Sequence, residues 1–316
     1  MDILPKGAPI ELPLPLTPCV ANWATACYQQ YDFGYLLTQS FLNRYYQIYL
    51  QRFIAERPAH CFLHCPHGTV VLQFTLQGPI TGAISGHGEI ELLTGQYSCF
   101  YLPAGIHTFR MHAGEYECLY IALDASLLEE LAASRDEIKK LLVCLHTASE
   151  HGACLSLRQM DYRVQDVIAE MRACKETGAN LLMELRTNIS TLLNLYRKSL
   201  NAAEHFKHLR STAYTPTMIS IQEEVSQNPS IQKHTLSYFA RKHNMSQSTL
   251  KRYFKDIFEK TLHEYVWEEC MKKAVWMRSN PAMSIEDIAD EVGYADKSGF
   301  LKSFKQFRLR AAGQGL

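Results

Sequence analysis

Two stretches in the last third of the chain repeat one spacing of apolar residues. Each begins with an apolar run that contains a small alanine, continues through a turn, and ends in a run with two apolar anchors four residues apart. The anchors are Leu250 and Phe254 in the first stretch and Phe300 and Phe304 in the second. Residues four apart share one face of a helix, so each run predicts a helix that packs through its anchors and leaves its other face free. The repeat therefore predicts two helix-turn-helix units.

The segments around the two units also have helical periodicity. A proline at position 216 restricts the residue before it and marks the start of an expected helix over 217–227. Gly293 suits a turn with positive φ in the second unit. A linking helix from about Leu262 to Met277 is predicted between the units, because its apolar stripe consists of Leu262, Tyr265, Val266, Ala274 and Met277.

The free faces of the two anchored helices carry basic and hydroxyl side chains. Lysine and arginine can bond guanine edges in the major groove and neutralise phosphates, and serine can bond base edges or backbone. A single basic helix is as often a solvated surface, but two copies with matching anchors favour DNA. The candidate DNA-binding residues are Ser248, Lys251, Arg252, Lys297, Ser298 and Lys302.

With these features, residues from about 218 to 307 resemble the DNA-binding domain of the AraC/XylS family of bacterial transcription regulators. The resemblance covers both units, the linking helix and one additional turn residue in the second unit. It implies two recognition helices in one chain, double-stranded DNA as the partner, a homodimer, and RNA polymerase as a possible further partner. Two departures are that Cys270 stands where the family has arginine and Glu269 where it has a hydrophobic residue. The tail 308–316 does not resemble the family's closing helix, which leaves the last element and full DNA affinity open.

The N-terminal half predicts β-structure. Residues 1–20 contain five prolines and are expected to form an extended arm. Short runs rich in aromatic and β-branched residues follow, separated by glycine and proline, which favours an antiparallel sandwich or barrel. The segment 95–107 resembles the cupin-type jelly roll that serves as sensor in many AraC-type regulators. The predicted strands are 45–53, 69–76, 88–92, 97–102, 107–112 and 117–123.

Two groups of residues invite a metal site. His87, Glu89 and His107 could suit iron, zinc or manganese, but the second histidine of an enzymatic cupin pair is missing. The cluster in 60–67 (His60, Cys61, His64, Cys65 and His67) lacks a second half-site at zinc-finger spacing. We therefore expect strand or turn residues in both places, with no metal and no cofactor.

The aromatic residues of this half could line an apolar ligand cavity, although simple barrel core is the default for any one of them. A sensor needs a cavity, so an unidentified small-molecule effector is expected. The candidate ligand contacts are Phe74, Tyr97, Tyr101, His107 and Phe109.

The middle of the chain has helical periodicity over 126–146, 160–174 and 181–196. We expect one apolar face of the last helix to pack on the barrel. A second apolar edge through Leu182, Leu193 and Leu195 could be covered by a partner subunit. A purely intramolecular helical layer is the alternative, and the family resemblance favours the homodimer.

Composition agrees with a multidomain α+β protein. The 316 residues have a formal net charge of zero, but 214–316 hold 15 basic against 12 acidic residues, whereas 1–150 hold 8 against 14. Ten irregularly spaced cysteines, no signal peptide and no long apolar run favour a reducing cytoplasm and no membrane span. The expected domains are a cupin-like sensor (1–150), a helical linker and dimerisation region (151–213) and the DNA-binding domain (214–316).

These features favour a ligand-responsive bacterial transcription regulator without enzymatic activity. One alternative is a cupin metalloenzyme with a degenerate DNA-binding domain. Another is an interaction module that has lost DNA binding. Stoichiometric metal would favour the first alternative, and failure to shift any genomic DNA fragment would favour the second.

Overall fold

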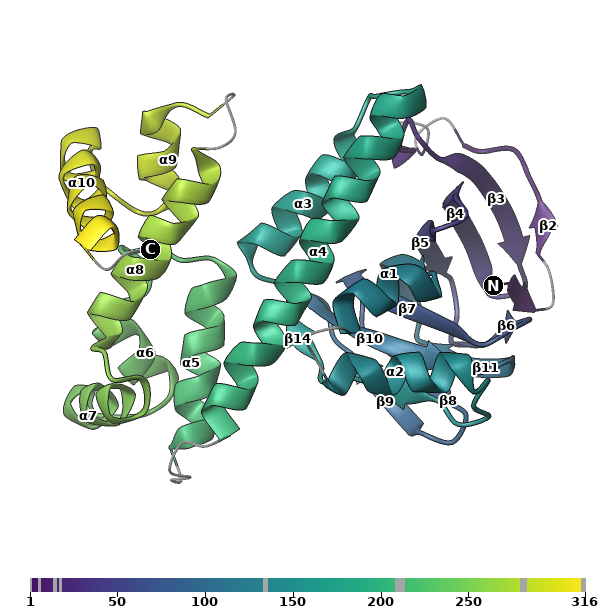
Figure 1. Ribbon diagram of the computed structural model, residues 1–316, viewed down its shortest axis with the longest axis horizontal. Helices are drawn as coiled ribbons and strands as arrows, with labels where there is room; N and C mark the ends of the chain where they lie inside the picture. The colour runs from purple at the N-terminus through teal and green to yellow at the C-terminus, as the bar shows by residue number, and fades with distance from the viewer. Residues whose placement is uncertain are drawn as a thin grey trace. The chain divides into compact units, whose positions relative to one another are not determined.

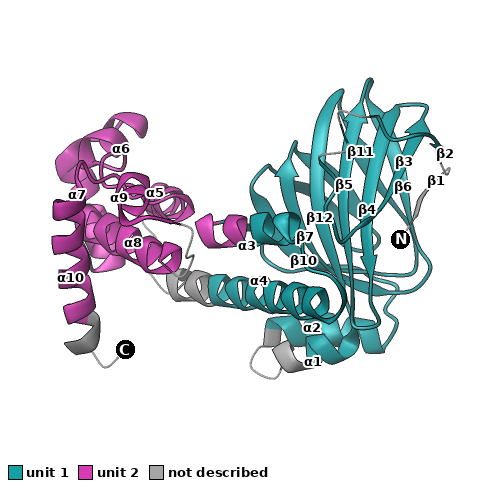
Figure 2. Ribbon diagram, turned by 90° about the horizontal axis from the view of Figure 1, so that it is seen from above, with its two compact units in different colours: residues 1–160, 167–200 teal, residues 161–166, 201–316 magenta. Residues whose placement is uncertain are grey.

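The computed structural model of the chain describes residues 2–4, 7–13, 16, 19–132, 136–207, 214–278 and 283–313. Strands fill the first part of the chain and helices the last part, as expected for a multidomain α+β protein (Figure 1). Figure 2 shows the two compact units, which are Met1–Met160 with Val167–Leu200 (unit 1) and Asp161–Asp166 with Asn201–Leu316 (unit 2).

Unit 1 contains two antiparallel sheets, which confirms the expected cupin-like barrel. Among the described residues, the smaller sheet has the order β1-β6-β11-β8-β9. Its strands are β1 (Asp2–Leu4), β6 (Ala59–Cys65), β8 (Ile80–Ile84), β9 (Gly88–Leu92) and β11 (Gly105–Met111). The larger sheet consists of β2 (Ala8–Pro9), β3 (Thr25–Tyr31), β4 (Gly34–Leu42), β5 (Tyr46–Ala55), β7 (Thr69–Gln77), β10 (Gln96–Leu102), β12 (Gly114–Leu123), β13 (Ala153–Cys154) and β14 (Arg158–Gln159).

Among the described residues, the barrel core includes two apolar clusters. One is built around Phe33, Phe53 and Tyr116, and the other around Ile90 and Phe100. Successive side chains of a strand point to opposite faces, so β5 alternates between buried and partly buried positions over 46–51 and again over 52–55. The six strands expected from the sequence are present, and β6 lies in the segment where strand or turn residues were expected, but β3, β4 and β8 were not expected. Strand β3 begins with three exposed residues, which gives it no clear apolar alternation.

The segment after the barrel differs from the expected helical region. Strands β13 and β14 both pair with β10, so residues 153–159 belong to the sheet rather than to a linker that begins at residue 151. The helical stretch expected over 126–146 consists of α1 (Ala125–Ala132) and α2 (Asp136–His146), and residues 133–135 between them lie outside the described residues. Helix α3 spans Tyr162–Ala173.

Helix α4 (Gly178–Lys207) packs through a broad apolar arc. The Tyr196 hydroxyl accepts from the backbone N–H of Cys99 at 3.3 Å, which ties the helix to β10. Leu193 and Leu195 are only 4% and 8% exposed, whereas Leu182 is 43% exposed. The prediction that a partner subunit covers Leu182, Leu193 and Leu195 is therefore corrected for Leu193 and Leu195, because both are already buried within the chain.

Unit 2 is all-helical around one apolar core. Its helices are α5 (Thr215–Gln227), α6 (Leu236–Lys242), α7 (Gln247–Phe258), α8 (Leu262–Met277), α9 (Ile285–Glu291) and α10 (Lys297–Gly313). The linking helix has the predicted bounds, and α5 begins two residues before the predicted start. Residues 208–213, at the end of the expected helical linker (151–213), lie outside the described residues.

Side-chain caps define where the helices of unit 2 begin. The hydroxyls of Thr235, Ser246, Thr261 and Ser284 each accept a hydrogen bond from the backbone N–H three residues later. The Glu264 carboxylate in turn accepts a hydrogen bond from the backbone N–H of Thr261, which completes a capping box. Each cap satisfies an N–H that the helix itself leaves unpaired, so the start of each helix is encoded locally.

The C-terminal tail continues the last helix instead of forming a separate closing element. Helix α10 runs without interruption to Gly313, and residues 314–316 lie outside the described residues. Phe307 packs edge-on against Trp267 with ring centroids 5.8 Å apart, and the Arg310 guanidinium lies 5.0 Å from the Trp267 ring centroid. The tail therefore extends the second anchored helix and packs it on α8.

A buried histidine makes the stability of unit 2 sensitive to acid. His234 is 4% exposed, its Nδ1 accepts from the Ser230 N–H, and its ring stacks on Phe239. Burial lowers the pKa of His234 to about 4, opposed by the Glu224 carboxylate and aided by the positive charges of Lys233 and Lys242. The imidazole is therefore neutral in the folded protein at neutral pH.

We expect acidification to destabilise unit 2 through this residue. Because the unfolded histidine titrates near 6.5, the unfolded state takes up the proton first, and stability falls as pH drops from about 6.5 towards 4. Between pH 7 and pH 5 the loss should be about 2 kcal/mol. Urea unfolding followed by tryptophan fluorescence measures it, and His234→Gln should lose correspondingly less over this interval. An equal loss in the variant would exclude His234 as the cause.

Candidate nucleic-acid interface and barrel cavity

The first helix-turn-helix unit consists of α6 and α7. Ala240 is buried where α6 meets the core, and its carbonyl accepts from the Met245 N–H at 2.8 Å. Asn244 adopts a left-handed conformation with φ 51°, which reverses the chain between the helices. The anchors Leu250 and Phe254 are fully buried, so the opposite face of α7 is turned outward.

The second unit, α9 and α10, repeats these contacts. The Ala289 carbonyl accepts from the Tyr294 N–H at 2.9 Å, and Phe300 and Phe304 take the two anchor positions. Gly293 has φ +82°, and a Cβ there would lie 2.5 Å from Ser230 Oγ and 3.0 Å from a backbone nitrogen. The positive φ and the close approach both require glycine at this turn.

All six side chains predicted to bind DNA are exposed. Four of them form a pattern that both helices share. Ser248 and Arg252 stand two residues before and after the anchor Leu250, as Ser298 and Lys302 do around the anchor Phe300. The exposed lysines Lys255 and Lys305 complete the pattern three residues further along. These two lysines were not among the predicted DNA contacts, although helical periodicity already placed them on the outward face. We call these two sets of three residues the α7 stripe (Ser248, Arg252, Lys255) and the α10 stripe (Ser298, Lys302, Lys305).

The surroundings of the basic side chains differ. The Arg252 guanidinium lies 4.8 Å from the Tyr253 ring centroid, and Tyr253 in turn contacts the Tyr214 ring. Such stacking restrains an arginine without neutralising it. Lys297 donates to Glu286 at 2.6 Å and lowers the pKa of that carboxyl. Lys297 is therefore partly neutralised, whereas among the described residues Lys302 has no acidic partner within salt-bridge distance.

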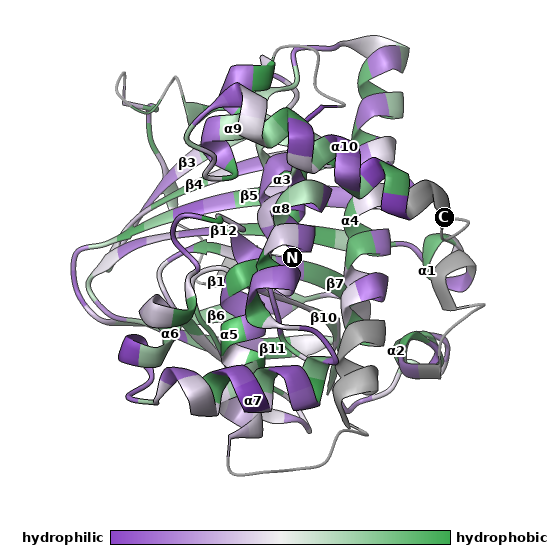
Figure 3. Ribbon diagram, turned by 90° about the vertical axis from the view of Figure 1, so that its left-hand side faces the viewer, coloured by the Kyte–Doolittle hydropathy of each residue, from purple (hydrophilic) through white to green (hydrophobic). Residues whose placement is uncertain are grey.

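Both stripes belong to helices on the same face of unit 2. Figure 3 shows α7 and α10 on that face, with hydrophilic residues along each. Helix α8 joins them through the common core. The buried Lys273 of α8 donates to Asn228 Oδ1 at 2.5 Å and to Glu291 Oε1 at 2.6 Å, which links α8 to the end of α9. The separation of the two stripes is thus set by packed structure.

The departures from the family pattern are accommodated in α8. Cys270 is fully buried, and burial raises the pKa of its thiol to about 12, so it fills the core as a neutral group. Glu269 accepts from Lys272 at 2.7 Å. Neither residue leaves an unpaired charge between the two helix-turn-helix units.

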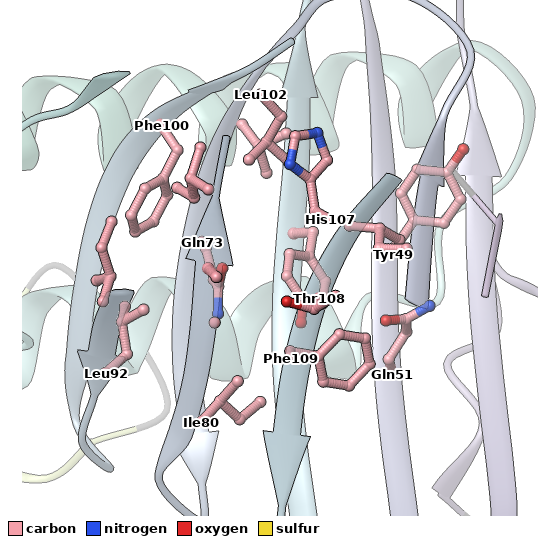
Figure 4. A pocket seen from close by; sticks show the side chains of 17 residues that line it. Tyr49, Gln51, Gln73, Ile80, Leu92, Phe100, Leu102, His107, Thr108 and Phe109 are labelled. Atoms are coloured by element: carbon pink, nitrogen blue, oxygen red, sulfur yellow. The ribbon is translucent and has the colours of Figure 1, made fainter. Parts of the chain in front are cut away.

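Unit 1 contains a cavity of about 100 Å³ between its two sheets. Figure 4 shows side chains from both sheets around it, including Gln51 and Gln73 from the larger sheet and His107 and Phe109 from β11. Apolar residues such as Ile80, Leu92 and Phe100 form most of the remaining wall. Two of the predicted ligand contacts, His107 and Phe109, therefore lie on the cavity.

The other three predicted ligand contacts lie elsewhere. Phe74 and Tyr97 stack on each other with centroids 5.1 Å apart, and Tyr97 meets Tyr196 of α4 edge-on. Tyr101 donates its hydroxyl to the Ser149 carbonyl. The three residues occupy the face of the larger sheet opposite the cavity, since Gln73 and Phe74 are neighbours on one strand and Gln73 lines the cavity. We therefore do not propose them as ligand contacts.

The candidate metal ligands are not brought together. Glu89 pairs with Arg110 at 2.5 Å, whereas the buried His107 lines the cavity. Cys61 and Cys65 are both buried on one face of β6, as the strand spacing predicts, and all ten cysteines are free thiols. Within the described part of the chain, no group of three or more His, Cys, Asp or Glu residues is arranged to hold a metal ion. Among the same residues, no helix combines the length and apolar character needed to span a bilayer.

Comparisons with known proteins agree with this geometry in unit 2. A protein family described as "Helix-turn-helix domain" matches residues 239–313. The Msm operon regulatory protein of Streptococcus mutans is 34% identical over 68 residues, which are 22% of this chain and 24% of that protein. The HTH-type transcriptional regulator YdeC of Bacillus subtilis is 29% identical over 76 residues, which are 24% of this chain and 26% of YdeC. The chain thus spans about a quarter of the length of these relatives.

Solved structures match over more of the chain but at low similarity. The AraC-like transcriptional activator CuxR has a TM-score of 0.37 at 11% identity, covering 91% of this chain and 92% of that chain. ToxT from Vibrio cholerae has a TM-score of 0.33 at 12% identity, covering 83% and 94%. The assignment therefore rests on the C-terminal match and on the two units described above. The C-terminal part of this chain is an AraC-type helix-turn-helix DNA-binding domain.

Proposed function

We propose that the protein is a ligand-responsive bacterial transcription regulator, active in the cytoplasm, that binds promoter DNA through α7 and α10. The observation that carries this proposal is the repeated stripe of serine and basic residues, exposed on α7 and again on α10. Arg252 and Lys302 take equivalent positions and suit guanine edges, whereas Lys255 and Lys305 suit phosphates. The two helices would enter successive major grooves, roughly 34 Å apart on one face of the duplex.

Unit 1 would supply the control. A ligand shifts an equilibrium only if it binds one arrangement of the protein better than another. The cavity between the sheets is the proposed effector site, with His107 and Phe109 among its contacts. A homodimer and contact with RNA polymerase remain parts of the proposal, and the buried Leu193 and Leu195 are excluded from any subunit contact surface.

Selection of bound DNA from a random pool tests the proposal, using the full chain with and without cell extract as the source of effector. Because the two stripes carry the same types of residue, the recovered site should contain two guanine-bearing half-sites about 10–10.5 base pairs apart. Extract should change the recovered fraction of DNA. Recovery of no sequence above the background of a Lys251→Ala, Arg252→Ala, Lys302→Ala variant would refute DNA-sequence recognition by these helices.

A further inference from the structure

One buried histidine defines the hydrogen bonding available in the barrel cavity. His107 is 5% exposed, and its Nε2 lies 2.9 Å from the Pro103 carbonyl oxygen. A carbonyl oxygen only accepts, so Nε2 carries the proton and donates. In the neutral imidazole Nδ1 is then an acceptor, and it is buried with no protein partner among the described residues. A cavity ligand with a hydroxyl or N–H donor would satisfy it.

Two amides add polar groups that can adapt to a ligand. Gln51 of β5 and Gln73 of β7 reach the same cavity from the larger sheet (Figure 4). Within the described residues, no protein group is found hydrogen-bonded to either amide. Each amide offers both a donor and an acceptor, so either can complete the hydrogen bonding of a hydroxyl placed near His107.

The cavity has no permanently charged side chain among the described residues that line it. Among the described residues, no Asp, Glu, Lys or Arg lines it. Burial raises the pKa of the lining Tyr120 well above its ordinary value, so this phenol also stays neutral. An ionised ligand would lose its hydration without gaining a counter-charge, which is strongly unfavourable.

The size and the walls of the cavity limit the ligand further. Its volume is about 100 Å³, and most of its lining is aliphatic or aromatic. For comparison, an engineered apolar cavity of roughly 150 Å³ binds benzene in another protein. A single ring or a short branched chain therefore suits this space.

We infer that the barrel cavity binds a compact, uncharged and largely apolar hydroxyl compound, of the size of a single-ring phenol, whose hydroxyl donates to His107 Nδ1. This inference rests on the proposed role of unit 1 as the sensor and names the chemical class that the sensor takes. Ile80, Leu92 and Phe109 would pack on the apolar part of the ligand, and Gln51 or Gln73 would donate to its oxygen.

Calorimetric titration of the full chain at pH 7 with phenol, toluene and benzoate tests the inference. The three probes have one ring each and differ in the hydroxyl and in charge. Phenol should bind at least tenfold more tightly than toluene, because toluene leaves Nδ1 and the amides unpaired, and benzoate should bind at least tenfold more weakly than phenol. Equal affinity for phenol and toluene, preference for benzoate, or no binding of phenol would each overturn the inference. These measurements use the unmodified protein and so do not depend on the folding of a variant.

A variant then assigns the effect to His107. His107→Leu should abolish the preference for phenol over toluene, whereas His112→Leu, at an exposed histidine just after β11, should keep it. An unchanged preference in a folded His107→Leu protein would contradict the assigned hydrogen bond. DNA binding of the same proteins, measured without and with phenol, separates the two proposals: if phenol binds as expected but leaves DNA affinity unchanged, the ligand class stands and its regulatory role does not.

Discussion

Replacing Arg252 and Lys302 together by alanine should reduce affinity for the selected DNA site by roughly 30-fold or more. The two side chains occupy equivalent exposed positions, one in each stripe. Loss of a base-edge contact costs about 1–3 kcal/mol, and the two contacts lie in different half-sites, so their losses should add. Titration of labelled duplex by gel shift or fluorescence anisotropy at fixed salt measures the change.

A matched control separates base contact from net charge. Lys140→Ala with Lys175→Ala removes the same two charges from exposed positions of unit 1 and should change affinity for the site by less than about threefold. On a scrambled duplex, the Arg252 and Lys302 variant should lose much less than on the selected site. Equal losses on both duplexes would assign the two residues to phosphate contact, and no loss on either would remove them from the interface.

The helix-turn-helix units could be predicted from sequence because their signals are local. Each unit is defined by a small alanine, a turn residue and two anchors, all within a short segment. The caps Ser246 and Thr261 stand directly before their helices, so the start of each helix is encoded by one hydroxyl side chain. Helix α8 consequently has the bounds that its apolar stripe predicts.

The cavity could be predicted only in part because both faces of the larger sheet are covered. Phe74 packs towards Tyr97 and α4, while its neighbour Gln73 faces the cavity. Alternation shows that adjacent residues face opposite sides, but it does not tell which side encloses a ligand. A glutamine within a strand is commonly taken as solvent-facing, and this is why Gln51 and Gln73 were missed.

Burial on α4 illustrates the same limit for helices. Leu193 and Leu195 lie beside the arc formed by Leu185, Ile189 and Leu192, and the whole arc is buried in the chain. A sequence pattern gives the width of an apolar face, but not how much of it the same chain covers. The extent of α10 could not be predicted for a related reason, since contacts with Trp267 from another helix hold its last turns.

The second large effect expected is the loss of binding when the two half-sites are moved apart. Helices α7 and α10 are joined by α8 through one core, and Lys273 links α8 to Glu291 at the end of α9. Both recognition helices therefore come from one rigid unit. Inserting five base pairs between the half-sites turns the second half-site to the opposite face of the duplex, because one turn takes about 10–10.5 base pairs. Inserting ten restores the facing but adds roughly 34 Å to the separation.

Affinity for this insertion series, measured with the full chain at one salt concentration, is the most direct test that two stripes at a fixed separation bind DNA. We expect both insertions to lower affinity by roughly 30-fold or more, since either one removes the contacts of a whole recognition helix. Undiminished affinity with five added base pairs, or recovery with ten, would contradict the account, because the two half-sites would then be bound by independently placed helices.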